Sequence, residues 1–160
     1  MKILITGGAG FIGQRLALQL LSRGIEVRIL DNFSQQIHSS DVLPAYLQKN
    51  VDLVKADIRN REAVKRALVG VDGIVHLAAE TGTGQSMYEI ERYFSVNVQG
   101  TATLLDLLQS ENCAQSIRSI VVASSRAIYG EGAYQCNAHG RVFPEQRGLE
   151  RMSSGAFEPI

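Results

Sequence analysis

Glycine residues at fixed spacing near the amino terminus could hold a phosphate group. Residues 6–13 read Thr-Gly-Gly-Ala-Gly-Phe-Ile-Gly and connect a short apolar segment to a stretch with helical spacing. They fit G-x-G-x-x-G through Gly8, Gly10 and Gly13, and G-x-x-G-x-x-G when Gly7 is the first glycine. Such glycines permit a tight turn, close approach of the backbone to a pyrophosphate and close packing of helix on strand. The N–H groups that begin the helix would then bind the phosphates, and the lysine of a mononucleotide P-loop is absent.

An acidic residue at the end of the next apolar segment supports this interpretation. Asp31 lies 18 residues after Gly13, where a carboxylate can accept hydrogen bonds from the adenosine ribose and repel a 2′-phosphate. The alternative is that Asp31 only caps the loop that starts at Asn32. No arginine directly follows Asp31, and Arg28 lies within the segment. The sequence therefore predicts NAD, rather than NADP, as the cofactor.

Short β-rich segments alternate with segments of helical periodicity. The expected strands are residues 2–6, 26–30, 52–56, 73–78 and 119–123. The expected helices are residues 13–23, 61–69 and 93–108, the second with Asn60 as its N-cap. This alternation predicts an α/β fold with a doubly wound parallel sheet of the Rossmann type, in strand order 3-2-1-4-5. A cofactor would cross the sheet at the switch between strands 1 and 4.

Composition excludes several other classes of protein. The chain has 160 residues, 45% of them hydrophobic, with 16 basic and 16 acidic side chains. This balance lacks the basic surface of a nucleic-acid binder, so no nucleic-acid partner is expected. The longest apolar run has four residues, 120–123, too short for a membrane span. The glycine-rich start does not fit a signal peptide and the two cysteines are too few for a disulfide framework, so we expect a cytoplasmic location.

Together these motifs resemble the NAD-dependent epimerase/dehydratase family of extended short-chain dehydrogenases/reductases, over residues 1 to about 130. Besides the glycine turn and Asp31-Asn32, the resemblance rests on Asp57-Ile58, His-Leu-Ala-Ala at 76–79 and Ser-Ser-Arg-Ala-Ile-Tyr-Gly at 124–130. It implies that Asp57 and Ile58 contact adenine, although a strand-end turn would also explain Asp57. His76 itself is expected to be a buried structural histidine.

The resemblance implies a set of cofactor-binding residues. The backbone after the fourth strand would lie along the nicotinamide-side ribose, Thr81 would reach the cofactor, and Asn97 would order the backbone of the site. Because Asn97 also shares a helical face with apolar residues, a structural role and a site role coincide there. The full set is Gly7, Gly10, Phe11, Ile12, Gly13, Asp31, Asn32, Asp57, Ile58, Leu77, Ala78, Ala79, Thr81 and Asn97.

The resemblance assigns Ser125 as a catalytic residue that hydrogen-bonds the reacting sugar oxygen, and Tyr129 as a structural tyrosine. Without the resemblance, Ser125 could equally satisfy backbone groups at a strand end. The family reaction also needs a Tyr-x-x-x-Lys pair, in which lysine lowers the pKa of the tyrosine base. The last lysine here is Lys65, and no tyrosine lies four residues before any lysine. We therefore predict that the chain alone is inactive.

The last thirty residues, 131–160, form an irregular segment similar to an insert of some nucleotide-sugar epimerases. We therefore expect a cofactor-binding domain over residues 1–130, with no substrate domain, from a longer enzyme. That enzyme would epimerise or dehydrate a nucleotide-diphosphate sugar, and the resemblance allows a homodimer through helix 93–108. The alternatives are a non-catalytic dinucleotide-binding sensor and, less well supported, a reductase of the same superfamily.

Two residues in this last segment have the spacing of zinc ligands. Cys136 and His139 form a Cys-x-x-His pair, which would be half of a tetrahedral site. Two ligands do not make a structural zinc site, so we favour an incidental pair and predict no metal site.

Overall fold

The computed structural model describes residues 1–110 and 115–158. The chain divides into two compact units, Met1–Ala123 and Ser124–Ile160, which are described separately. Cys113 lies outside the described residues. Every helix in the described ranges is too short or too polar to cross a membrane.

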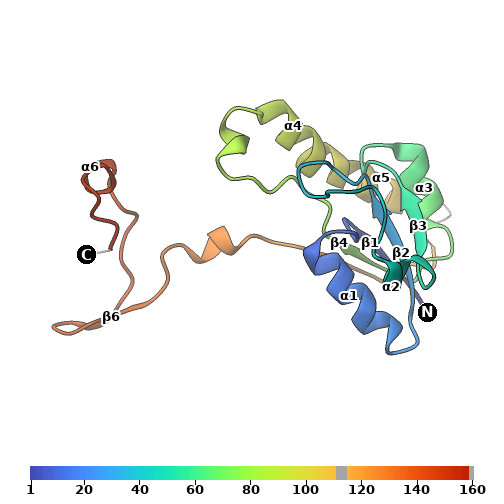
Figure 1. Ribbon diagram of the computed structural model, residues 1–160, viewed down its shortest axis with the longest axis horizontal. Coiled ribbons are helices and arrows are strands. Elements are labelled where there is room, and N and C mark those ends of the chain that lie inside the picture. The colour runs from blue at the N-terminus through green and yellow to red at the C-terminus, as the bar shows by residue number, and fades with distance from the viewer. Residues whose placement is uncertain (111–114, 159–160) are drawn as a thin grey trace. The chain divides into compact units, whose positions relative to one another are not determined.

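The first unit contains a five-stranded parallel sheet (Figure 1). The strand order is β3-β2-β1-β4-β5, as predicted. The strands are β1 (Lys2–Thr6), β2 (Glu26–Asp31), β3 (Asp52–Lys55), β4 (Gly73–His76) and β5 (Ser119–Val122). Thr6 pairs with Leu30 on one side and His76 on the other, so β1, β2 and β4 end together. The Rossmann-type fold is confirmed, and the three strand ends form one edge.

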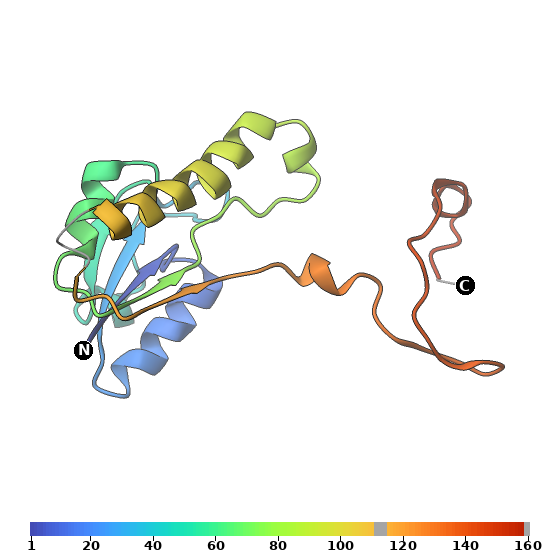
Figure 2. The same ribbon diagram turned by 180° about the vertical axis from the view of Figure 1, so that it is seen from behind.

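Helices cover both faces of this sheet (Figures 1 and 2). The described helices of this unit are α1 (Phe11–Leu21), α2 (Ala45–Gln48), α3 (Arg61–Leu68), η1 (Gln85–Met87), α4 (Ile90–Phe94), η2 (Ser95–Gln99) and α5 (Gly100–Ser110), of which η1 and α4 extend beyond the sheet (Figure 1). One buried cluster includes Ile5, Ala17 and Leu47, from the α1 and α2 side. The other includes Leu4, Val64 and Leu107, from the α3 and α5 side. Burial on both faces explains the nearly continuous apolar character of β1.

Several predicted boundaries differ from the structure by a few residues, among them both ends of α1, and two of the differences lie beside the site. The fourth strand was expected to reach residue 78, but β4 ends at His76. The N–H of Ala78 donates to the Thr6 side chain (Oγ1, 3.2 Å) and not to a backbone carbonyl of the neighbouring strand, so the strand does not continue. The helix expected over 93–108 is a longer helical segment from Ile90 to Ser110, interrupted by the π-helical stretch η2.

Side chains fix both ends of α3. The Asn60 Oδ1 accepts the Ala63 N–H at 3.1 Å, which confirms the predicted N-cap. At the other end, the Arg28 Nη1 donates to the carbonyls of Ala67 (2.9 Å) and Val69 (2.7 Å). These carbonyls belong to the last turn, which has no intrahelical donors. Arg28 therefore packs β2 against α3.

The second unit has little regular structure. It contains η4 (Arg126–Tyr129), the strands β6 (Tyr134–Cys136) and β7 (Gly140–Val142), and α6 (Leu149–Ser153). β6 and β7 pair as an antiparallel hairpin that the sequence did not predict. Arg147 joins two parts of this unit, because it pairs with Glu131 at 2.8 Å and donates to the Phe157 carbonyl at 2.7 Å.

Candidate dinucleotide-binding site

The glycine turn between β1 and α1 depends on positions that have no room for a side chain, among them Gly7 and Gly13. Gly7 has φ +68°, and a Cβ there would lie 2.7 Å from the Ala78 nitrogen. A Cβ on Gly13 would lie 2.5 Å from the Cα of Gly8, so the helix packs directly on the turn. Gly7 is therefore the glycine that makes the tight turn, and the G-x-x-G-x-x-G spacing describes the geometry.

The start of α1 presents backbone donors rather than side chains. Gly10 is the N-cap residue, and it has no side chain to occupy the first N–H groups. The first turn, which is fully described, contains no acidic residue. Phe11 and Ile12 are 83% and 65% exposed. The positive end of the helix dipole therefore remains available to an anion.

A cavity of about 340 Å³ lies at the edge of the sheet where β1, β2 and β4 end. Its volume is in the range typical of small-molecule sites. Twelve of the predicted cofactor-binding residues line it: Gly7, Gly10, Phe11, Ile12, Gly13, Asp31, Asn32, Ile58, Leu77, Ala78, Ala79 and Thr81. Asp57 and Asn97 do not, and Ser125 belongs to the second unit.

The charges of the cavity suit a ligand whose phosphates are bound by backbone groups. Among the described lining residues, His38 is the only basic side chain. Asp31 and Glu80 are acidic. The described lining contains no arginine or lysine, so a diphosphate bound here would depend on N–H groups such as those of the turn. The bare turn and the open helix start fit a dinucleotide.

Asp31 connects the glycine turn to the loop after β2. Its Oδ2 accepts the Ala9 N–H at 3.0 Å, and its Oδ1 accepts the Phe33 N–H at 2.8 Å. The His38 Nε2 lies 3.6 Å from the same Oδ1. Phe33 has φ +53°, a left-handed conformation that is rare for an aromatic residue and that the buried ring holds in place. Asp31 thus orders this loop while it also lines the cavity.

Asp57 is bound to its own neighbours outside the cavity. Its carboxylate accepts hydrogen bonds from the Arg59 guanidinium (both 2.8 Å) and from the Asn32 Nδ2 at 3.1 Å. Hydrogen bonding by the Arg59 side chain lowers the pKa of Asp57 to about 2, although burial of the carboxylate acts in the opposite direction. The next residue, Ile58, is buried and lines the cavity.

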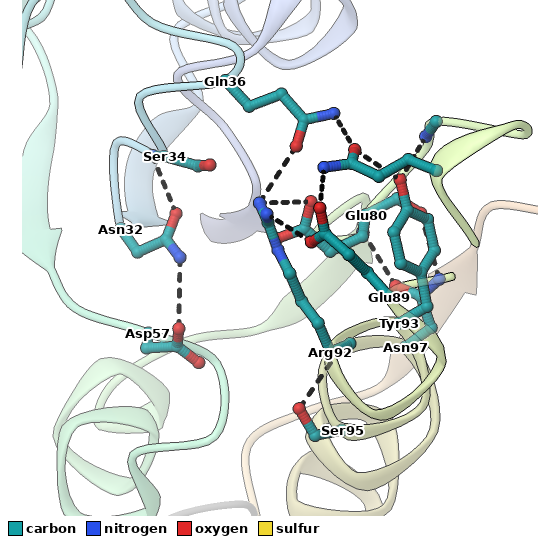
Figure 3. Close-up of polar contacts among 12 residues, drawn as sticks. Asn32, Ser34, Gln36, Asp57, Glu80, Glu89, Arg92, Tyr93, Ser95 and Asn97 are labelled. Carbon is teal, nitrogen blue, oxygen red and sulfur yellow. Dashed lines mark hydrogen bonds and ion pairs between the residues drawn. The ribbon is translucent and has the colours of Figure 1, made fainter. Parts of the chain in front are cut away.

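Asn97 orders the backbone of the loop after β4. Its Oδ1 accepts the Glu80 N–H at 2.8 Å and its Nδ2 donates to the Glu80 carbonyl at 3.0 Å (Figure 3). Asn97 lies in η2, and π-helical turns are often found at functional sites. The Glu80 side chain, which lines the cavity, is therefore held in place through its own main chain.

His76 is a structural histidine, as the sequence predicted. It is 4% exposed and lies between Thr6 (Oγ1 to Nδ1, 2.6 Å) and Thr101 (Oγ1 to Nε2, 2.9 Å). The Thr101 hydroxyl donates to the Asn97 carbonyl at 2.7 Å, so we assign the ring proton to Nε2. Burial lowers the pKa of His76 and favours the neutral ring.

The second unit contains the remaining predicted residues. The Ser125 Oγ accepts the Ala127 N–H at 3.1 Å at the start of η4, and Tyr129 is exposed. The Cys136 Sγ and the His139 Nδ1 lie 3.3 Å apart on the β6–β7 hairpin. The described residues contain no group of three or more metal-binding side chains. Zinc binding by this pair stays a hypothesis.

The sequence did not identify every residue of the cavity. Three of the missed residues, Ser34, Ile37 and His38, lie in the loop after β2, where no periodicity marks their direction. Glu80 could have been found, because it lies between the predicted Ala79 and Thr81. The other missed lining residues are Leu30, Ala56 and Val96.

The chain is similar to curated nucleotide-sugar epimerases. The dTDP-L-rhamnose 4-epimerase of Burkholderia thailandensis is 41% identical over 159 residues, which are 98% of this chain and 43% of that protein. The bifunctional UDP-glucose 4-epimerase and UDP-xylose 4-epimerase 1 of Pisum sativum is 33% identical over 137 residues, 81% of this chain and 38% of that protein. The chain thus spans less than half the length of these relatives.

Solved structures show the same likeness. The UDP-glucose-4-epimerase of Stenotrophomonas maltophila, with bound NAD and formylated UDP-arabinopyranose, has a TM-score of 0.68 and 30% identity over 81% of this chain and 38% of that one. The UDP-glucose 4-epimerase of Bifidobacterium longum, in complex with NAD+ and UDP, has a TM-score of 0.69 and 28% identity over the same shares. A family model matches residues 3–144. The chain belongs to the NAD dependent epimerase/dehydratase family.

Proposed function

We propose that this chain binds NAD as the cofactor-binding part of a nucleotide-sugar epimerase or dehydratase. The observation that carries the proposal is the glycine turn, where Gly7 and Gly13 leave no room for side chains beside an open helix start. The diphosphate would lie against the N–H groups of Phe11 and Ile12. Asp31 would accept hydrogen bonds from the adenosine ribose through its remaining lone pairs.

The other predicted residues complete the proposed binding mode. Ala78 and Ala79 line the part of the cavity at the end of β4, where the nicotinamide ribose would lie. Ile58 would contact adenine, and Asp57 would hold Asn32 in position beside it. When bound, NAD supplies the acceptor and later the donor of a hydride. Ser125 would donate a hydrogen bond to the sugar oxygen that loses its proton.

Binding is tested by calorimetry on the chain with NAD and with NADP. We expect NAD to bind and NADP to bind at least about tenfold more weakly, because Asp31 repels a 2′-phosphate. Asp31→Asn keeps the shape of the side chain and removes the charge, so it should reduce this selectivity. Asp41→Asn, an exposed change in the same loop, should leave it unchanged. Absence of NAD binding by folded protein would overturn the proposal.

A non-catalytic sensor is the second candidate, because the sequence lacks a Tyr-x-x-x-Lys pair. Neutral tyrosine is a weak base at pH 7 without a cationic neighbour. Both candidates predict that this chain binds NAD without turnover. A longer form that includes sequence after residue 160 should convert a nucleotide-diphosphate sugar without net consumption of NAD. A longer form that binds NAD and converts no such sugar would favour the sensor.

We also propose that the chain pairs with a second copy through its long helical segment. Ile90, Phe94, Val98 and Leu105 are all at least 48% exposed on this segment. Their spacing places them along one side, and the family resemblance assigns pairing to this helix.

The pairing is tested by substitution on this side of the helix. Phe94→Glu should shift the mass measured by light scattering toward the monomer. Val69→Glu, at another exposed apolar site after α3, should not. A wild-type chain that is monomeric at high concentration would contradict this proposal.

A further inference from the structure

Two loops on opposite sides of the cavity are joined by side chains. The loop after β2 contributes Ser34, Ile37 and His38 to the lining, and the segment after β4 contributes Ala79 and Glu80. In the sheet, β1 and its glycine turn lie between these two strands. A dinucleotide that extends from one loop to the other must therefore cross the end of β1.

Gln36 reaches from the first loop to the second (Figure 3). Its Nε2 donates to the Gln85 Oε1 at 2.5 Å, and its Oε1 accepts from the Arg92 Nη2 at 3.0 Å. Both functional groups of the Gln36 amide are thus used across the gap between the loops. Gln36 itself is exposed and does not line the cavity, so it joins the loops from outside.

Arg92 anchors this connection on the far side. Its Nε and Nη2 each donate to the Glu80 carboxylate at 3.1 Å, and its Nη1 donates to the Glu89 Oε2 at 2.9 Å. The planar guanidinium matches this arrangement, since it offers several N–H groups in a fixed fork. Arg92 also places a positive charge beside Glu80, one of the two acidic side chains of the described lining.

The segment that carries Arg92 is itself held rigidly. The Tyr93 hydroxyl accepts the Gly82 N–H at 2.9 Å and donates to the Gln85 Oε1 at 3.0 Å. The two hydrogen bonds from Asn97 to the Glu80 main chain complete this support. The partners of Gln36 therefore stay in position, and separation of the loops requires that the Gln36 contacts break.

We propose that Gln36 and Arg92 form a latch that holds the two loops around the bound dinucleotide and slows its release. The inference rests on the proposed NAD binding. It makes Gln36 and Arg92 positioning residues, because neither lines the cavity. The contacts are partly exposed, so the latch can open without unfolding of the unit.

The test is a double-mutant cycle on the rate of NAD dissociation from the 160-residue chain. Gln36→Ala, Arg92→Met and the double variant are preloaded with NADH, and the loss of its fluorescence is followed after mixing with excess NAD. Each single change should raise the dissociation rate about tenfold, the effect of one hydrogen bond to a charged group. The double variant should be no faster than the faster single variant, because Gln36→Ala already removes both contacts between the loops, including the one from Arg92.

The controls separate a latch from general damage. Arg61→Met removes an arginine that pairs with Asp106 away from the cavity, and it should leave the rate unchanged. Should Arg92→Met fail to fold, Gln36→Ala still tests the proposal, since the exposed Gln36 contributes little to the core. Wild-type dissociation rates in Gln36→Ala, or rates that multiply in the double variant, would overturn the latch. Absence of NADH binding by the wild-type chain would instead overturn the proposed function.

Discussion

The two sides of the cavity differ in the atoms that form them: backbone atoms on one side and side-chain contacts on the other. On the β1 side, backbone atoms form the site, and Gly7 and Gly13 serve it by having no side chain. On the β4 side, side chains position the loop: Asn97 binds the Glu80 main chain and Arg92 binds the Glu80 carboxylate. The first side has little tolerance for substitution, whereas the second can be altered one hydrogen bond at a time.

This difference assigns different tasks to the two sides. A backbone cradle binds any diphosphate and depends on shape. A side-chain network has adjustable strength, because each contact contributes only about 0.5–3 kcal/mol. We infer that the β1 side decides whether a dinucleotide binds, and that the β4 side adjusts how firmly its loop is held.

The largest effect should come from Gly13→Ala. Its new Cβ would lie 2.5 Å from the Gly8 Cα and 2.6 Å from the Gly8 oxygen, so α1 must move away from the turn. We expect the free energy of unfolding to fall by about 3 kcal/mol, at the upper end for an overpacked site. Gly24→Ala is the matched control, because nothing lies within 4 Å of its Cβ. The free energy of unfolding of Gly24→Ala should fall by only about 1 kcal/mol, because alanine is less favourable than glycine at this left-handed φ. Urea unfolding of both variants measures the difference, and equal losses would contradict the shape argument.

On the β4 side, Asn97→Asp should have the next largest effect. A carboxylate can still accept the Glu80 N–H but cannot donate to the Glu80 carbonyl, where Nδ2 now lies at 3.0 Å. The expected loss is about 2 kcal/mol in unfolding free energy. Faster hydrogen exchange at the Glu80 amide should accompany it. Asn50→Asp removes a similar single donation, to the Tyr46 carbonyl, at an exposed site. If Asn50→Asp loses as much stability, the hydrogen bond from Asn97 to the Glu80 carbonyl contributes no more than an exposed hydrogen bond does.

The pH dependence of stability should reflect His76. Burial lowers its pKa in the folded state below the ordinary value of 6.5. Below pH 6.5 the unfolded chain therefore binds a proton that the folded chain does not. The contribution of neutral His76 to the free energy of unfolding should be fully present above pH 6.5. Below that pH, the free energy of unfolding should fall by up to about 1.4 kcal/mol per pH unit. His76→Gln should flatten this slope between pH 7.5 and 5.5 in urea unfolding, and the exposed His139→Gln should not. An unchanged slope in His76→Gln would exclude His76 as its source.

The smallest effect should come from Tyr93→Phe. The change removes one hydroxyl that accepts from Gly82 and donates to Gln85. The ring stays buried, so we expect a loss of about 1 kcal/mol. Tyr46→Phe removes an exposed hydroxyl bonded to Gln14 at 2.7 Å, and it should cost less. Thermal unfolding of the two variants compares them directly, and a larger loss in Tyr46→Phe would reverse the expectation.

The same contrast explains what the sequence could predict. Glycine spacing and strand periodicity are local, so the turn, the strand order and Asp31 at its edge could be predicted before any contact was known. The Gln36–Arg92 and Glu80–Arg92 contacts join polar residues that are far apart in sequence, and each such residue has many equivalent surface partners. The break in the helix at η2 was also missed, since residues 95–99 keep ordinary helical periodicity.

The π-helical stretch η2 accommodates an extra residue within one long helix. Asn97 in this stretch is directed at Glu80, while Leu104 and Leu107, both 0% exposed, still face the sheet. Because a π-helical turn takes up one more residue than an α-helical turn, deleting one residue between 95 and 99 would restore regular winding and leave these leucines facing the sheet. The direction of Asn97 would change instead, so a homologue with a one-residue gap here could keep its core but must order the loop after β4 by other means.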